Sequence, residues 1–186
     1  MYFVSAWSRD GRFALYSPDP NSLWSAPVSG DGQPQPVVRI SGVVDQSSFS
    51  PDGHWVAYSG DETGRMEVFV VPFPPTGQRW QVSTAGGVQP LWRGDGRELF
   101  YLEPDGQLVS VDVSAAPSFT VGSRRPLFRT DLHDPSFMVE DYGVTADGQR
   151  FLFLLPADSR PPELKLVLDW PALLGKQNRP AVAPTP

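Results

Sequence analysis

Aspartate precedes glycine at four points where the surrounding sequence also repeats, and these carboxylates are the first groups in the chain that could do chemistry. They occur in the pairs Asp10-Gly11, Asp52-Gly53, Asp95-Gly96 and Asp147-Gly148. Clustered carboxylates can bind calcium or act as acid and base. However, the ligand spacing of an EF-hand loop is missing, and aspartate before glycine is typical of a turn in which the carboxylate accepts a backbone N–H. We therefore predict that these residues build turns and bind no metal.

The two histidines do not form a catalytic or metal-binding group with residues close in sequence. His54 follows the second Asp-Gly pair, and His133 lies in a longer connection that also contains Asp134. The chain has no cysteine and no Gly-x-Ser-x-Gly nucleophile elbow, which excludes thiol chemistry, cysteine zinc sites and an α/β-hydrolase nucleophile. The sequence therefore predicts no catalytic residue, no metal and no cofactor. We expect a chain that is not itself an enzyme, although it could belong to a larger one.

The Asp-Gly pairs are positioned by an internal repeat. Its four copies are WSRDGRFALYS, FSPDGHWVAYS, WRGDGRELFYL and VTADGQRFLFL, each with an aromatic or β-branched residue, a turn and then an apolar strand. Successive turn glycines are 42, 43 and 52 residues apart, whereas one β-propeller blade takes ~40–45 residues. The longer last spacing is explained by an insertion before the fourth copy. The pattern predicts an all-β propeller built of four-stranded antiparallel blades.

Composition supports this fold class and narrows the classes of function. The 186 residues include 17 glycines and 21 prolines, which is typical of many short strands and turns. Acidic residues outnumber basic residues by 21 to 15, for a net charge of −6, so the chain lacks the basic surface that nucleic acids and anionic membranes attract. No apolar run is long enough to span a membrane, and the first residues lack the features of a signal peptide. We expect a soluble chain whose compartment the residues leave open.

The repeats divide the chain into one domain and a tail. We place the four repeats at about 1–41, 42–84, 85–130 and 131–170. A short helical turn follows, so that the predicted propeller spans 1–176. Residues 177–186 carry three prolines and are predicted to be a disordered tail.

Two finer predictions concern burial. Alternation of residue types over Leu108–Val113 predicts a half-buried outer strand in the third repeat. Tryptophans occur mainly at strand starts and strand centres, and we predict that most of them belong to the core between blades rather than to a surface that stacks sugars or bases.

The repeats resemble the TolB-like, or WD40-like, β-propeller repeats in the C-terminal region of bacterial serine/threonine protein kinases. The resemblance is carried by SLWSAPVSGDG, FSPDGHWVAYSGDETGRMEVFVVPFP, QVSTAGGVQPLWRGDGRELFYLEPDGQL, ADGQRFLF and LVLDWPALL. The sequence departs from the repeat at the turn proline, which is replaced by Arg9, Gly94 and Ala146. The resemblance implies a non-catalytic, extracytoplasmic module that senses a signal or binds a protein partner.

Two questions of architecture and function stay open at this point. The four repeats could be the C-terminal part of a propeller of about six blades, as the resemblance implies, or four blades that close on themselves. The function could be that of an interaction scaffold or sensor, of the auxiliary propeller of a prolyl-oligopeptidase-class peptidase, or of a propeller that binds a small ligand or glycan. In an unclosed propeller, exposed blade edges would favour self-association.

The connections opposite the Asp-Gly turns are the predicted binding face. They are longer and more varied than the turns, and varied loops on a rigid scaffold are where binding usually resides. We predict that a partner or ligand contacts five residues near the mouth of the propeller channel, with a preference for cationic groups. These residues are Asp45, Gln46, Gln89, His133 and Asp134.

Overall fold

The structure is a computed structural model and describes residues 3–115, 118–132, 141–154 and 164–168. All regular secondary structure in these ranges is β-strand, and none of these residues forms a helix that could cross a membrane. The strands are β1 (Phe3–Trp7), β2 (Phe13–Asp19), β3 (Ser22–Pro27), β4 (Gln35–Arg39), β5 (Val44–Phe49), β6 (Trp55–Gly60), β7 (Glu67–Pro72), β8 (Trp80–Gln81), β9 (Val88–Trp92), β10 (Glu98–Leu102), β11 (Gln107–Ser114), β12 (Thr120–Arg129), β13 (Tyr142–Val144), β14 (Arg150–Leu154) and β15 (Leu164–Leu168).

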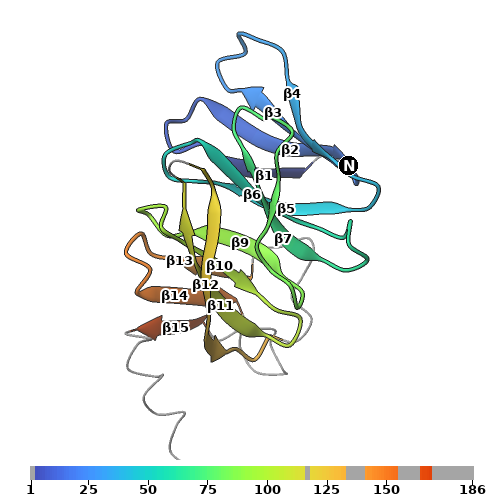
Figure 1. The fold of residues 1–186 in the computed structure, drawn as a ribbon. Coiled ribbons are helices and arrows are strands. Elements are labelled where there is room, and N and C mark those ends of the chain that lie inside the picture. Colours follow the sequence, from blue (N-terminus) through green and yellow to red (C-terminus); the bar gives the residue numbers. More distant parts are fainter. Residues whose placement is uncertain (1–2, 116–117, 133–140, 155–163, 169–186) are drawn as a thin grey trace, which may run out of the picture.

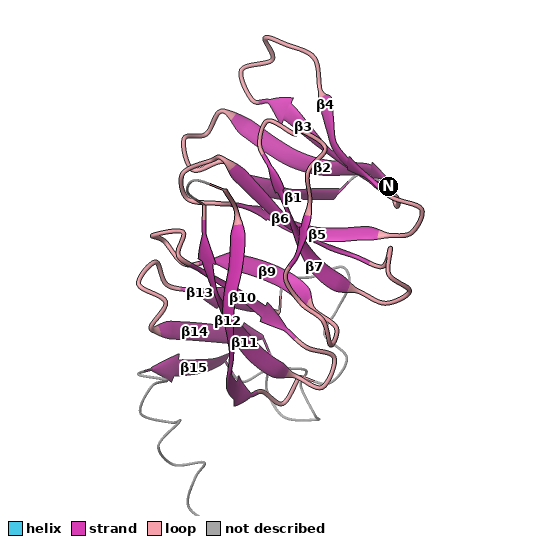
Figure 2. Ribbon diagram, viewed as in Figure 1, coloured by secondary structure: helices cyan, strands magenta, loops and turns pink. Residues whose placement is uncertain are grey.

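The strands form four antiparallel sheets that follow one another along the chain. The sheets are β1–β4, β5–β8, β9–β12 and β13–β15, and within each sheet every strand pairs with the next in sequence. We call these sheets the first to fourth blades. Figure 1 shows them stacked from the blue first blade at the top to the orange fourth blade at the bottom, and Figure 2 shows strands and loops, and no helix, among the described residues. The prediction of an all-β propeller is confirmed.

Each blade has the same turn between its first and second strands. The turn glycines Gly11, Gly53, Gly96 and Gly148 have φ angles of 70–73°, a region that favours glycine. The aspartate before each glycine accepts a hydrogen bond from the backbone N–H two residues further on, at 3.0–3.1 Å. In three of the turns a serine or threonine hydroxyl also donates to this aspartate. The carboxylates therefore hold separate turns.

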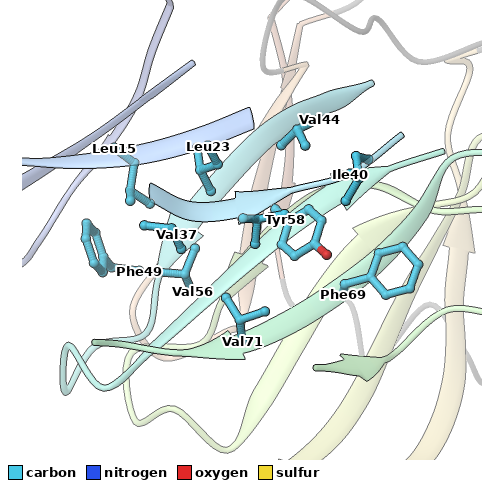
Figure 3. Packing of buried hydrophobic residues seen from close by; sticks show 11 residues of the cluster. Leu15, Leu23, Val37, Ile40, Val44, Phe49, Val56, Tyr58, Phe69 and Val71 are labelled. Carbon is cyan, nitrogen blue, oxygen red and sulfur yellow. The ribbon is translucent and has the colours of Figure 1, made fainter. Parts of the chain in front are cut away.

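The hydrophobic core lies between the blades. One cluster joins the first and second blades, where Leu15 and Leu23 pack against Phe49, Val56 and Tyr58 (Figure 3). A second cluster joins the second and third blades, and a third cluster joins the third and fourth. Complete burial of one such leucine or phenylalanine contributes roughly 1.5–3 kcal/mol. Packing between sheets, rather than within any one of them, therefore holds the fold together.

The described blades do not close into a four-membered ring. None of the three clusters contains residues of both the first and the fourth blades. The two ends of the arrangement instead expose large apolar side chains, with Val4 and Trp7 of β1 64% and 59% exposed and Leu154 of β14 53% exposed. The described chain therefore forms part of a propeller, and the alternative of four-blade closure is not observed.

The prediction for Leu108–Val113 is wrong. Strand β11 is not half-buried, because its blade lies between two others: Val109 and Val111 face the second-blade cluster, and Leu108 faces the fourth-blade cluster. The outer strand of this blade is β12, whose first seven residues are exposed.

The tryptophans divide between core and surface. Trp92 is buried and Trp55 and Trp80 pack half-buried against the second cluster, as predicted. Trp7 is mostly exposed. Trp170, the helical turn and the tail lie outside the described residues.

Candidate functional site

The first strands of successive blades line the axis of the propeller. Strand β1 packs against β5, and β5 packs against β9, while β13 is tied to the third blade by a hydrogen bond from the Tyr142 hydroxyl to the Gln89 carbonyl at 2.9 Å. We call the end of the axis at the Asp-Gly turns the turn end, and the opposite end the loop end. The two ends carry different chemical groups.

A groove of about 520 Å³ opens at the turn end and is lined by all four blades. Its apolar wall is made by the residue four positions before each turn glycine, which is the first residue of each repeat motif. These residues are Trp7, Phe49, Trp92 and Val144. We call this cavity the axial groove. Since one repeat position supplies one wall residue per blade, the repeat itself builds the groove.

The residue two positions before each turn glycine forms the rim of the axial groove. Proline occupies this position in the second blade alone among the four. Arg9, Pro51, Gly94 and Ala146 occupy this position in the four blades, and all line the groove. The Gly94 N–H donates to the Ala146 carbonyl at 2.8 Å, and a β-carbon on Gly94 would lie 2.7 Å from that oxygen. Glycine therefore permits the close approach of the third and fourth turns.

Arg9 gives the axial groove its charge. It is exposed, and among the described residues that line the groove it alone is charged. No ion pair of Arg9 occurs within the described ranges. Sequence reasoning missed this groove, although its signal was present: the same two repeat positions supply its wall and its rim.

The predicted residues Asp45, Gln46 and Gln89 lie at the loop end, where the first strands begin. Both strands are irregular at these residues. Strand β5 departs from regular pairing with β6 between Val44 and Ser47, and β9 departs from regular pairing with β10 between the partners of Phe100 and Leu102, which brackets Gln89. Such bulges change the direction in which side chains point and are frequent next to functional sites.

Gln89 is held inside the protein by hydrogen bonds to residues of the second and fourth blades. Its side chain is 2% exposed and its φ of 56° is unusual for a residue other than glycine. Its amide nitrogen donates to Asp141 Oδ2 at 2.7 Å, and its amide oxygen accepts from the Asp141 N–H at 2.8 Å. The backbone of Gln89 bonds the Ser59 and Tyr142 hydroxyls. Gln89 thus joins the third and fourth blades and positions the loop end.

Asp45 and Gln46 lie at the start of β5, in the second blade. Gln46 is 9% exposed, and Asp45 is half-buried. Burial raises the pKa of the Asp45 carboxyl to about 7, opposed in part by a hydrogen bond from the Gln46 backbone. Asp45 Oδ2 is inaccessible to solvent and has no hydrogen-bond partner within the described structure. His133 and Asp134 lie outside the described residues, and contact of a partner with any of the five stays a prediction.

A second polar arrangement repeats around the loop end and was not predicted. In the second blade the Tyr58 hydroxyl donates to Glu62 Oε1 at 3.0 Å, and Arg79 forms an ion pair with Glu62. Burial raises the pKa of the Tyr58 hydroxyl above its usual value. Tyrosine, acid and arginine come from three different elements, so only their joint recurrence in the next blade could have revealed the arrangement from sequence.

The third blade repeats this arrangement. Arg124 Nε donates to the Tyr101 hydroxyl at 3.3 Å and also forms an ion pair with Glu103. The first blade repeats only the pairing of acid and arginine, with Arg39 4.0 Å from Asp19. Asp19, Glu62 and Glu103 are therefore each paired with an arginine of the same blade.

The described residues contain no group of three or more His, Asp or Glu side chains placed to hold a metal ion. His54 is exposed beside its turn. The aspartates of the four turns each serve their own turn, as described above.

Comparison with known proteins supports the fold. No protein-family model and no curated protein matches the chain. Among solved structures, it is similar to TolB from Acinetobacter baumannii, with a TM-score of 0.69 and 17% identity over 91% of this chain and 41% of that one. It is also similar to the Cps50 (Swd1) β-propeller domain of Myceliophteria thermophila, with a TM-score of 0.57 and 17% identity over 87% of this chain and 55% of that domain.

The tricorn protease is a third similar structure, with a TM-score of 0.64 and 14% identity over 92% of this chain and 22% of that one. The chain thus spans about half or less of the length of these proteins. At such identities the likeness establishes a TolB-like and WD40-like propeller fold.

Proposed function

We propose that this chain is a non-catalytic propeller module that binds a protein partner through the axis of its blades. The observation that carries the proposal is the axial groove, in which four blades present aromatic and aliphatic side chains beside Arg9, a cation without an ion pair among the described residues. Exposed aromatic and arginine side chains are enriched where proteins bind one another. A concave apolar wall with one charged group is a common form of binding site.

The internal use of the other polar groups supports a binding role over catalysis. The turn aspartates cap turns, Gln89 bridges two blades, and Glu62 pairs with Arg79. A catalytic site needs an acid, base or nucleophile within reach of a substrate, and the described residues that line the axial groove include one arginine but neither a carboxylate nor a histidine. We propose on this basis that the chain itself catalyses no reaction.

The test is capture of partners from a bacterial extract by the immobilised chain. The experimental variant is Trp7→Ala with Arg9→Ala, which removes an exposed wall residue and the groove cation. The matched control is Val121→Ala with Arg97→Ala, since both residues are also exposed and neither lines the axial groove. We expect the groove variant to lose a specific partner that the wild type and the control retain. Identical sets of partners from all three proteins would contradict the proposal.

The finer proposal is that the module is the sensing or scaffolding part of a bacterial serine/threonine kinase. It rests on the resemblance of the repeats, which covers most of the chain. Its test is the gene: a protein kinase domain in the same reading frame would support it, and a reading frame without one would contradict it.

The similarity to the tricorn protease favours one further candidate, the auxiliary propeller of a peptidase. The two tests above separate this candidate from the kinase module. A peptidase module would capture a peptidase from the extract or share a reading frame with one.

A further inference from the structure

Among the buried and half-buried carboxylates of the described structure, Asp45 differs from the others in its hydrogen bonding. The others are each engaged by a hydrogen bond or an ion pair. They are Asp19, Asp61, Glu62, Glu67, Glu98, Glu103, Asp112 and Asp141. Even Glu67, which is completely buried, is bound by Arg65 and by the Gly86 N–H. Asp45 alone keeps a carboxylate oxygen that is buried without a donor.

The described strands that pack against Asp45's strand, β5, carry no cation that could compensate it. Strands β1, β2, β6 and β9 pack against β5, and none of them carries a lysine, arginine or histidine. Their ionisable side chains are Tyr16, Asp19 and Tyr58. Asp61 faces the loop before β5, where its carboxylate accepts from the Val43 N–H at 2.6 Å. The positive group that would normally accompany a half-buried carboxylate is therefore absent from these strands.

Leaving a buried acceptor without a donor costs roughly 1–3 kcal/mol. Asp45 lies where β5 departs from regular pairing with β6, between Val44 and Ser47 at the loop end. The residue is half-buried, so part of its surface stays exposed. An incoming donor would remove the cost.

We propose that Asp45 is the anchor for an ammonium or guanidinium group, which a binding partner inserts at the loop end of the axis. This inference rests on the proposed binding function and names the chemistry of the partner at a second point, distant from the axial groove. A charge-assisted hydrogen bond to a carboxylate that is partly removed from water is stronger than one formed in water.

Binding of such a cation depends on pH, because only the ionised carboxylate attracts it. Burial places the Asp45 pKa at about 7. The ionised fraction is then roughly one tenth at pH 6 and nine tenths at pH 8, so that affinity for the cation rises about tenfold over this interval. Burial also raises the pKa of the Tyr58 hydroxyl, so this neighbour of β5 stays neutral over the interval and does not reverse the dependence.

The experiment uses the full chain, with the Asp45 carboxyl carbon observed by NMR and assigned from its absence in Asp45→Asn. The probes are blocked tripeptides with arginine, lysine or glutamine between two glycines, together with n-butylammonium. We expect the arginine or lysine peptide to shift the Asp45 signal saturably, to lower its titration midpoint and to bind about tenfold more tightly at pH 8 than at pH 6. The glutamine peptide should not bind.

Asp45→Asn should abolish both the binding and its pH dependence, whereas Asp31→Asn, at an exposed loop aspartate, should change neither. Preference for the peptides over n-butylammonium would assign the cation to a protein partner, and equal binding would assign it to a small amine. The proposal is overturned if the cationic probes produce no saturable shift, if glutamine binds equally or if Asp45→Asn retains the affinity. Failure here with loss of partners in the Trp7 and Arg9 variant would leave the proposed binding function standing.

Discussion

Gln89 offers a test in which backbone strain and hydrogen bonding can be separated. Its left-handed φ of 56° costs ~1–2 kcal/mol in a residue other than glycine. Its side chain exchanges two hydrogen bonds with Asp141 across the third and fourth blades. Gln89→Ala keeps the strain and loses both bonds, leaving the Asp141 carboxylate and N–H without these partners. Since a hydrogen bond to a charged group contributes ~1.5–3 kcal/mol, we expect a destabilisation of about 2–4 kcal/mol.

Gln89→Gly loses the same bonds but relieves the strain. We therefore expect it to be more stable than Gln89→Ala by about 1 kcal/mol, because alanine at positive φ is penalised and glycine is not. Urea unfolding at constant pH, followed by far-UV circular dichroism, measures both differences. Asp141→Ala serves as the coupling control: in combination with Gln89→Ala its effect should be clearly less than additive. Equal stability of the alanine and glycine variants would refute the strain, and additivity with Asp141→Ala would refute the bridge.

Three further predictions concern the charge, the packing and the ends of the blades. Asp45→Asn should stabilise the fold by about 1–2 kcal/mol at pH 8 and by little at pH 4. Burial raises the pKa of the Asp45 carboxyl in the folded state from 3.8 to about 7, so the wild type loses stability as pH rises through this window. The full shift corresponds to ~4 kcal/mol, which solvent screening of the half-buried group reduces. Urea unfolding measures the difference in stability between Asp45→Asn and the wild type, and an equal difference at both pH values would contradict this prediction. Gly94→Ala should destabilise the fold by about 1–3 kcal/mol because its β-carbon meets the Ala146 carbonyl, whereas Gly143→Ala, with open space around it, should be tolerated better. Thermal unfolding measures both variants, and equal midpoints would argue against the close contact between the turns. The exposed apolar side chains of β1 and β14 should cause the chain to self-associate at micromolar concentration, and a monodisperse monomer in light scattering would be the contrary result.

The fold could be predicted from sequence because its determinant is local and repeated. Each turn needs an aspartate to accept a backbone N–H and a glycine at positive φ, and four such turns in register set the strand boundaries on both sides. Strand β10 begins and ends where the apolar run Glu98–Leu102 does. Burial was less predictable. The alternation in β11 indicates a solvent-facing side, but the strand lies between two other blades, and no pattern within a strand reveals what packs on it.

The site was partly predictable, for the same reason. The connections opposite the Asp-Gly turns predicted that Asp45 and Gln89 lie at one end of the axis, and the structure places both residues at that end. It could not show that Gln89 is taken up by Asp141, which is 52 residues away in sequence. The axial groove was overlooked because its wall residues look like ordinary core aromatics when each repeat is considered singly. Only their convergence on one axis turns four equivalent positions into one cavity.

The two ends of the axis differ in the sign of the charged side chain that is not neutralised by a neighbour. At the loop end one acid in each of the first three blades is paired with an arginine, whereas Asp45 keeps a buried carboxylate oxygen without a donor in the described structure. At the turn end the axial groove carries Arg9 without an ion pair in the described structure. Because paired charges at an exposed rim contribute little to affinity and unpaired ones are available to a partner, discrimination between partners should depend on these two residues. They belong to different blades and opposite ends, so a partner that contacts both must run along the axis, and one that contacts a single end will respond to only one of the two variants.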